Sequence, residues 1–344
     1  MERMKCIKLS CALFLCFVSF FCQPLFARGG VLAGSSGSLS VIKTTYFDII
    51  YPPASSSAAE QIAAVCDGYY EELCQSFLIE PCDHFPVTIT HSVESLNASF
   101  SLWPYNHIIL YDVPPGTSLD MNEQTIENVF YHELTHAVTG NIKNKRLRFW
   151  SGLIGDFLSP TFFSMTQFWI EGVAVEAESR GESGRLHDPY STLLVLQAKQ
   201  QGRFPSYRDV TGARDIYPGG TDAYMFGGLF SRYLCETYGR EAYASYWKRL
   251  GYGKKVVPKD DLFFALTGKH MKETWKDFEA WLAVPACTEA LDAETGSYDF
   301  FVASELSRPV RKTALSRTNN RLQLFSLIDT CSHGAVWYEI GRAH

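Results

Sequence analysis

The sequence predicts an α+β fold with a mixed β-sheet in its N-terminal half and a mostly helical C-terminal half. Segments rich in β-branched and aromatic residues, which are typical of strands, concentrate before residue 112. Apolar residues three or four positions apart, the spacing of an amphipathic helix, dominate from about residue 122 to residue 282. Strand-like segments return after residue 290. Strands that come early and helices that come late are typical of α+β organisation.

In the first half we expect three strands, at Thr45–Tyr51, Pro86–Thr90 and His107–Tyr111. Between the first two strands, a helix is predicted over Ala58–Phe77. Its apolar residues recur on one helical face, at Ile62, Val65, Tyr69, Leu73 and Phe77.

In the second half, the first predicted helix runs from about Asn122 to Thr139, and Gly140 is its stop signal. Another helix is expected over Gln167–Ser179. The segment between them, 143–167, is expected to be an excursion with an exposed apolar patch around Phe149–Phe163. This patch could contact a lipid surface, a partner protein or the core of the chain itself, and the sequence leaves these alternatives open. Further helices are predicted at Thr192–Gln200, Asp222–Tyr238, Glu241–Leu250 and Met271–Leu282.

The two ends of the chain have their own character. The N-terminus predicts a signal peptide over 1–27. It has a basic start, an uncharged and mostly apolar run from Cys11 to Phe26, and Ala27 before a cleavage site. We therefore expect export to the periplasm, the cell envelope or the medium. A Gly/Ser-rich linker is expected over 28–44 and one large domain over 45–290. Residues 291–344 are expected to be the truncated start of a β-rich second domain, with strands near 298–303, 321–327 and from Val336.

Charge and cysteine content restrict the partners. A net charge of −6 argues against nucleic acid, because phosphate binding requires a positive face. The cysteines beyond the signal region are expected to be structural, since an exported protein can form disulfides, although one sequence does not reveal their pairing. The sequence leaves the oligomeric state open.

One short motif carries the chemistry, His132-Glu133-Leu134-Thr135-His136. Residues four apart project from the same face of a helix, so the imidazoles of His132 and His136 can bind one metal ion. Glu133 is then placed to take a proton from a water molecule that attacks a carbonyl. The motif predicts a hydrolase with one Zn²⁺ ion; the alternative is an amphipathic helix with two hydrogen-bonded histidines.

Two histidines leave a catalytic zinc site one protein ligand short. Glu171 is the candidate, because it lies among Trp, Ile, Gly and Ala, and a carboxylate in apolar surroundings needs a partner. The alternative is a surface glutamate. Gly172 and Ala174 are small enough for another helix to approach closely.

The motif and the downstream W-x-E-G-x-A at Trp169–Ala174 together resemble the gluzincin zinc metallopeptidases, in particular the peptidase MA-like group. The resemblance covers roughly 46–282 and implies a zincin-like domain that cleaves peptides or proteins. It implies His132, His136 and Glu171 as zinc ligands and Glu133 as general base. Tyr224 resembles a tyrosine that several gluzincins supply to the oxyanion. A packed core aromatic is the alternative for it, and Tyr217 and Tyr190 are further candidates.

The chain departs from that family pattern in three respects. The interval between His136 and Glu171 is long, which implies an insertion beside the site. Val175 occupies the position one turn after Glu171 where thermolysin-like proteins carry an Asp. No Gly-x-Met-Glu-Asn motif precedes the zinc helix, which favours an endopeptidase.

Two further expectations follow from the resemblance. The strand at His107–Tyr111 is expected at a sheet edge, where an extended peptide can add as a further strand. The alternative to an enzyme is a catalytically silent binding or scaffolding protein of the cell envelope that keeps the peptidase fold.

Overall fold

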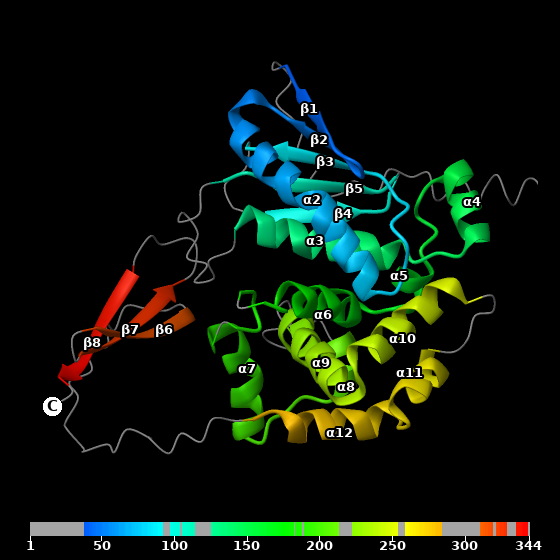
Figure 1. Cartoon of the computed structure of the whole chain (residues 1–344). Helices are drawn as coiled ribbons and strands as arrows, with labels where there is room; N and C mark the ends of the chain where they lie inside the picture. Colours follow the sequence, from blue (N-terminus) through cyan, green and yellow to red (C-terminus); the bar gives the residue numbers. More distant parts are fainter. Residues whose placement is uncertain are drawn as a thin grey trace, which may run out of the picture. The chain divides into compact units, whose positions relative to one another are not determined.

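The computed structural model of the chain describes residues 38–91, 97–103, 105–113, 125–181, 183–187, 189–212, 222–253 and 259–283, together with three later strands. The chain forms two compact units (Figure 1). Unit 1 contains Met1–Met165 and Gly239–Leu262, and unit 2 contains Thr166–Tyr238 and Phe263–His344. Each unit is described by itself below.

Unit 1 is built on a five-stranded mixed sheet with the order β1-β2-β3-β5-β4. The central strands β2, β3 and β5 run parallel, whereas β1 and β4 join the two sides antiparallel. The strands are β1 (Ser40–Lys43), β2 (Phe47–Tyr51), β3 (Phe85–Thr90), β4 (Asn97–Ser101) and β5 (His107–Tyr111).

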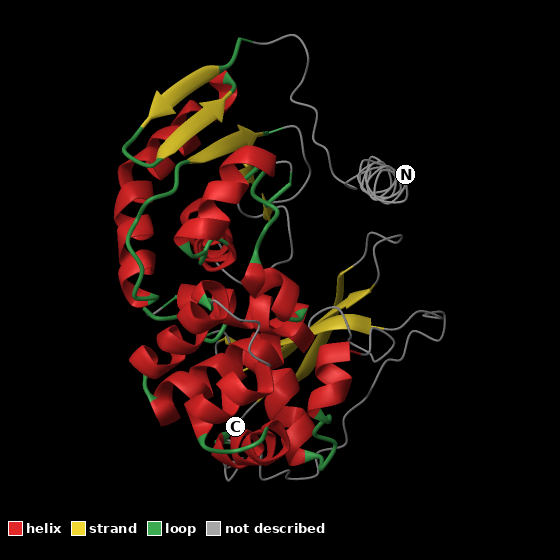
Figure 2. Ribbon diagram, turned by 90° about the vertical axis from the view of Figure 1, so that its right-hand side faces the viewer, coloured by secondary structure: helices red, strands yellow, loops and turns green. Residues whose placement is uncertain are grey.

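One face of this sheet carries the core of unit 1. Alternate residues of the central strands are buried, among them Phe47, Val87 and Ile108, as a sheet with one covered face requires. Helix α2 (Ser56–Ser76) packs on β1 and β2, and α3 (Ile126–Gly140) packs on β4 and β5. Because α2 and α3 also contact each other, they lie side by side on the same face (Figures 1 and 2).

Four shorter elements complete unit 1: η1 (Pro53–Ser55), α4 (Lys145–Ile154), α5 (Pro160–Ser164) and α10 (Arg240–Tyr252). Helix α10 packs on α2 and α5, although it follows them by more than seventy residues in the sequence. Gly251 of α10 lies against Ile142 so closely that a Cβ atom would overlap the backbone there.

Unit 2 centres on the packing of α6 (Gln167–Glu178) against α9 (Asp222–Tyr238). The two helices meet at a pair of glycines, where a Cβ atom on Gly172 would lie 2.6 Å from the carbonyl carbon of Gly227. An aromatic cluster that includes Phe168, Phe230 and Trp275 fills the space around this crossing. The remaining helices are α7 (Pro189–Gln200), α8 (Tyr207–Gly212) and α12 (Met271–Trp281), and α11 (Lys259–Thr267) continues from unit 1 into unit 2.

The predicted α+β class, with its N-terminal mixed sheet and helical second half, is confirmed. Strand β5 and helix α9 have the predicted bounds. Residues Ser40–Lys43, which the sequence predicts as linker, form strand β1, and β4 was not predicted. In the later segment, β6 (Val310–Thr318), β7 (Arg321–Ile328) and β8 (Ala335–Arg342) form a three-stranded antiparallel sheet. The strand expected at 298–303 lies outside the described residues.

One prediction about the sheet is wrong. His107–Tyr111 is not an edge strand, because β5 pairs with β3 on one side and with β4 on the other. Within the sheet that the structure describes, the edges are β1 and β4. The pairing that decides this comes from Asn97–Ser101, whose short polar residues gave no strand signal.

Two sequence expectations concern cysteines and membranes. The described thiols of Cys66, Cys74 and Cys82 are free. Cys6, Cys11, Cys16, Cys22, Cys287 and Cys331 lie outside the described residues. Among the described helices, none is both long enough and apolar enough to cross a membrane. The predicted signal peptide, 1–27, lies outside the described residues.

Candidate metal centre

Helix α3 carries the HExxH motif in the interior of unit 1. The hydroxyl of Thr125 caps its start by accepting a hydrogen bond from the amide of Asn128 at 3.2 Å. The helix is buried on most of its circumference, since it contacts α2, β4, β5 and α5. Its apolar positions Phe130 and Leu134 are fully buried. Polar residues therefore lie in this helix at positions where their groups need partners other than water.

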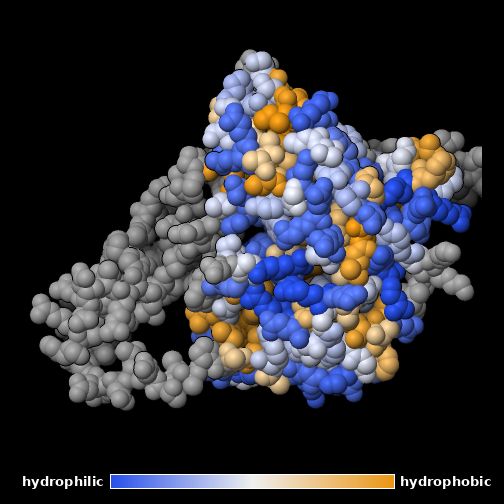
Figure 3. All heavy atoms as spheres, viewed as in Figure 1, coloured by the Kyte–Doolittle hydropathy of each residue, from blue (hydrophilic) through white to orange (hydrophobic). Residues whose placement is uncertain are grey.

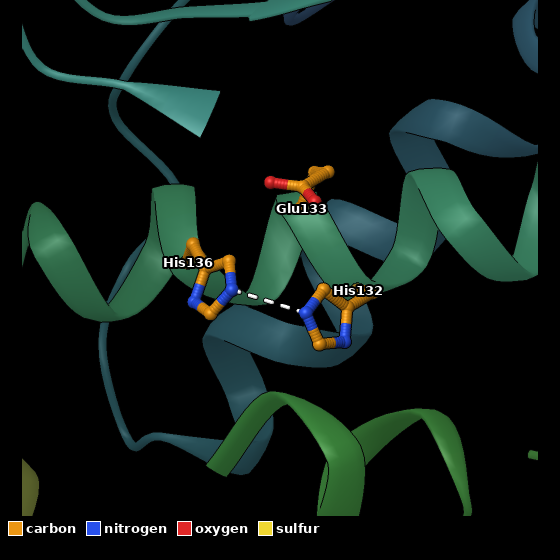
Figure 4. Close-up of side chains that lie close together, drawn as sticks. All are labelled: His132, Glu133 and His136. Atoms are coloured by element: carbon orange, nitrogen blue, oxygen red, sulfur yellow. Dashed lines mark hydrogen bonds between the residues drawn. The ribbon is translucent and has the colours of Figure 1, made fainter. Parts of the chain in front are cut away.

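The three chemical groups of the motif converge on one point (Figure 4). His132, Glu133 and His136 are 6%, 8% and 7% exposed. The Nε2 atoms of His132 and His136 lie 3.1 Å apart, and the rings are nearly perpendicular. One ligand atom from each of the three residues can be chosen so that all lie within 4.8 Å of one another. The predicted convergence of both imidazoles on one site is therefore present in the structure.

This donor set fits a zinc ion. Two nitrogen ligands at about 2.0–2.1 Å from a tetrahedral zinc are separated by roughly 3.3 Å, and the observed separation of the two Nε2 atoms is 3.1 Å. No hydrogen bond or ion pair joins the Glu133 carboxylate to another described residue. A carboxylate oxygen of Glu133 lies within 4.8 Å of a ligand nitrogen of each imidazole. A divalent ion between the imidazoles would place a positive charge beside this carboxylate.

Polar side chains hold the C-terminal end of α3 in place. Its last carbonyls lack helical partners, as at any helix end. The side-chain amide of Asn141 donates to the carbonyl of Ala137 at 2.8 Å. The hydroxyl of Ser159 donates to the carbonyl of Gly140 at 2.7 Å, and that of Thr161 donates to the carbonyl of Thr139 at 2.8 Å. The histidine-bearing helix is thus fixed to the segment that follows α4.

The proposed third ligand, Glu171, lies on α6 in unit 2, where it is partly exposed. Its neighbours Gly172, Val173 and Ala174 are buried. Gly172, which we expected to permit a close helix approach, faces Gly227 of α9. Since Glu171 belongs to unit 2 and the motif to unit 1, its role as a ligand stays a prediction.

Tyr224 lies in the first turn of α9 and is partly exposed, so it is not a fully buried core aromatic. The guanidinium carbon of Arg185 lies 5.0 Å from the centre of its ring. This distance is within the range of a cation–π contact. Its role as an oxyanion donor stays a prediction. Of the two other candidates, Tyr217 lies outside the described residues, as does the side chain of Tyr190.

Arg185 is a residue that the sequence analysis did not identify. Its guanidinium donates to both carboxylate oxygens of Glu178, at 2.6 Å and 2.8 Å. Burial alone lowers the pKa of Arg185, but the hydrogen bond and charge of Glu178 outweigh it and raise the pKa above its usual value. Tyr224 and Glu171 act in the same direction. Arg185 therefore links the electrostatics of the two predicted site residues of unit 2.

Glu176 also differs from a surface residue. It is fully buried, and its carboxylate pairs with Arg180 at 3.4 Å. Val175, one turn after Glu171, is fully buried against Gly228 of α9. Val175, which stands where thermolysin-like proteins carry an Asp, thus contributes to the packing of α6 on α9.

No family model matches the chain. It is 34% identical over 212 residues to an uncharacterized protein of Treponema pallidum (strain Nichols), a match that covers 60% of the chain and 19% of that protein. The chain therefore spans about a fifth of its relative's length.

Several solved structures are similar to parts of the chain. They include an aminopeptidase N family protein from Idiomarina loihiensis, with 12% identity, a TM-score of 0.41 and coverage of 71% of this chain and 46% of that one. The M1 zinc metallopeptidase from Deinococcus radiodurans has 17% identity and a TM-score of 0.40, over 70% of this chain and 51% of that one. Native yeast LTA4 hydrolase has 15% identity and a TM-score of 0.41, over 71% of this chain and 38% of that one. The chain thus spans about half, or less, of each of these proteins.

Proposed function

We propose that the chain is a zinc-dependent peptidase that hydrolyses peptide bonds inside extended peptide or protein substrates. The convergence of two buried imidazoles and one buried carboxylate on α3 carries this proposal. His132 and His136 would hold one zinc ion together with Glu171, and Glu133 would act as general base. The family resemblance of the W-x-E-G-x-A segment supports Glu171 in this role.

Zinc in this site would lower the pKa of a water molecule towards neutrality and polarise the carbonyl of the scissile bond. The Glu133 carboxylate takes a proton from the attacking water while the water oxygen forms a bond to the carbonyl carbon. Glu133 then delivers that proton to the amide nitrogen as the C–N bond breaks. The hydroxyl of Tyr224 donates a hydrogen bond to the oxygen that becomes negative in the tetrahedral intermediate.

The edge strand β4 of unit 1 is an argument for an extended substrate. Strand β4 is an edge of the described sheet, and it packs against α3. An edge strand presents unpaired amide and carbonyl groups to which an extended peptide can add. Strand β4 is therefore the proposed docking edge in place of His107–Tyr111, which is an internal strand.

The test separates metal binding from catalysis. We expect about one zinc per chain in the wild type, measured by elemental analysis of the purified protein. Glu133→Gln should keep the zinc and lose peptide cleavage by about 10²–10⁴-fold, since general base catalysis contributes that much. His132→Gln and Glu171→Gln should lose zinc. His91→Gln, a variant of an exposed histidine, is the control and should keep both.

The outcomes distinguish the alternatives. Absence of zinc in folded wild-type protein after reconstitution with zinc would refute the proposal. Zinc at full occupancy without cleavage of any peptide in a diverse library would favour a silent binding protein. Full zinc occupancy in Glu171→Gln would refute Glu171 as the third ligand and leave the rest of the proposal standing.

We also propose that the chain is exported to the periplasm, the cell envelope or the medium. The basic start, the apolar run and Ala27 support this. N-terminal sequencing of the protein recovered from expressing cells should give a mature start at Arg28. Recovery of an uncleaved chain from the cytoplasm would contradict export.

A further inference from the structure

Helix α4 presents its apolar side chains to the solvent. Phe149, Trp150, Leu153 and Ile154 are 65%, 45%, 64% and 51% exposed. Their spacing places them on one side of the helix. A surface helix of a globular protein normally turns its apolar stripe towards the core. Figure 3 shows hydrophobic atoms next to hydrophilic ones where Figure 1 places α4. The orientation of α4 is thus the reverse of the usual one.

Polar contacts on the opposite side hold α4 in this orientation. Arg148 forms an ion pair with Asp83. Lys143, whose side chain is buried, precedes the helix and donates to the carbonyl of Asp156 at 2.9 Å and to the hydroxyl of Ser151 at 3.3 Å. A rotation that turned the apolar side inward would break these contacts and leave buried charges without partners, which is strongly unfavourable.

The connection between β4 and β5 carries two further exposed aromatic side chains. Trp103 and Tyr105 are 53% and 57% exposed. The ring of Trp103 packs edge-on against Phe157, at 5.5 Å between centroids. The amide of Asn106 donates to the carboxylate of Asp156 at 3.0 Å. These contacts fix the connection to the segment that follows α4. The exposed apolar side of the helix, Phe149, Trp150, Leu153 and Ile154, is named the α4 surface below.

The charge of α4 is opposite to that of the chain. The ten residues Lys145–Ile154 contain no acidic residue, whereas the net charge of the chain is −6. Lys145 and Arg146 are exposed in the first turn, next to the apolar side. The ion pair with Asp83 neutralises Arg148, so Lys145 and Arg146 are the exposed cations of the helix.

The geometry points to an anionic lipid bilayer as the partner, and we propose that the α4 surface docks onto one. Exposed aliphatic and aromatic side chains beside lysine and arginine are typical of helices that lie in a bilayer interface. Tryptophan and tyrosine favour the headgroup level. Phe149, Leu153 and Ile154 insert at the boundary of headgroups and acyl chains. Lys145 and Arg146 contact the lipid phosphates.

Co-sedimentation of residues 28–344, the proposed mature chain, with vesicles tests the docking. Vesicles of phosphatidylcholine alone are compared with vesicles that also contain phosphatidylglycerol. We expect binding to the anionic vesicles that weakens at high salt. The double variant Phe149→Ser, Leu153→Ser should bind on the order of tenfold more weakly, because two apolar side chains leave the lipid. Lys145→Gln, Arg146→Gln should also weaken binding on the order of tenfold.

Matched controls isolate α4. Leu193→Ser, Leu194→Ser removes two comparably exposed leucines from α7. Lys272→Gln, Lys276→Gln removes two exposed cations from α12. Both controls should bind as the wild type does. All proteins compared begin at Arg28, so the apolar stretch Cys11–Phe26 contributes to none of the measurements.

A second measurement does not depend on a variant. Brominated acyl chains in anionic vesicles should quench part of the wild-type tryptophan fluorescence, and Trp150→Phe should reduce that quenching. The proposal is overturned if the wild type does not bind anionic vesicles, if it is not quenched, or if the α4 variants bind equally well. It is also overturned if the wild type dimerises without binding vesicles and the Phe149, Leu153 variant is monomeric. The α4 surface would then be an interface between two copies.

Discussion

The glycine contact between α6 and α9 permits a quantitative test of the packing in unit 2. A Cβ atom at Gly172 would lie 2.6 Å from both the carbonyl carbon and the carbonyl oxygen of Gly227, and 2.8 Å from its Cα. These distances are about 0.6–0.8 Å too short, because ordinary van der Waals contact begins at 3.4 Å. The obstacle is backbone, so a side-chain rotation does not relieve it. In Gly172→Ala the helices must separate.

The magnitude follows from two opposing effects. Overpacking of a well-packed contact costs about 1–3 kcal/mol, whereas alanine in place of a helical glycine gains up to about 1 kcal/mol. Since the obstacle is rigid, we expect Gly172→Ala to lose about 2 kcal/mol of unfolding free energy net. Gly68→Ala on α2 is the matched control. Gly68 is also a helical glycine, but a Cβ atom added there would meet no atom within 4 Å, so this variant should gain about 0.5–1 kcal/mol.

Urea denaturation followed by far-UV circular dichroism measures both variants. The midpoint should fall for Gly172→Ala and rise for Gly68→Ala. If Gly172→Ala were as stable as the wild type, the close approach of α6 and α9 would be refuted. Because these helices carry Glu171 and Tyr224, their separation should also weaken zinc retention if the proposed site is correct.

Three further predictions concern charges and thiols. Burial raises the pKa of Asp67, but hydrogen bonds from a threonine hydroxyl and two amides outweigh it and lower the pKa below its usual value. The ionised Asp67 carboxylate therefore stabilises the folded chain above about pH 4, and this stabilisation is lost as pH falls through the folded pKa. Asp67→Asn should flatten the dependence of the melting temperature on pH between about pH 4 and 2.5. A curve of melting temperature against pH that runs parallel to that of the wild type would contradict this. Glu178→Gln should destabilise by about 3 kcal/mol in denaturation experiments, because it removes the negative charge that pairs with the largely buried guanidinium of Arg185. Asp277→Asn, at an exposed ion pair, should change stability by under about 1 kcal/mol. Burial raises the pKa of Cys74 to about 12. Maleimide at neutral pH should therefore label the exposed Cys82 well before Cys74, which peptide mapping measures. Equal labelling rates for the two thiols would contradict the burial of Cys74.

Local patterns explain what could be predicted from the sequence. Helix α9 and strand β5 have strong apolar periodicity, and their predicted bounds agree with the structure. The two histidines are one helical turn apart, so their convergence depends on α3 alone and follows from the motif. Patterns of this kind need no knowledge of the tertiary fold.

The features that were missed depend on contacts between distant residues. Strand β4 consists of Asn, Ala, Ser, Phe and Ser, so its pairing with β5 determines its conformation more than its own propensity does. Because β4 was missed, β5 was wrongly placed at an edge. Arg185 follows Glu178 by seven residues and lies in a loop beyond the end of α6, so no regular element brings the two together. Their pairing is visible only in the folded chain.

The discontinuity of unit 1 has a consequence for biosynthesis. Helix α10 packs on α2 and α5, and Gly251 lies against Ile142, yet unit 2 residues Thr166–Tyr238 separate α10 from the rest of unit 1. During translation the first 165 residues emerge well before α10 does. The surfaces of α2 and α5 on which α10 packs therefore stay uncovered until α10 has been synthesised. A nascent chain arrested at Tyr238 should be more sensitive to protease in its first 165 residues than one arrested after Leu262.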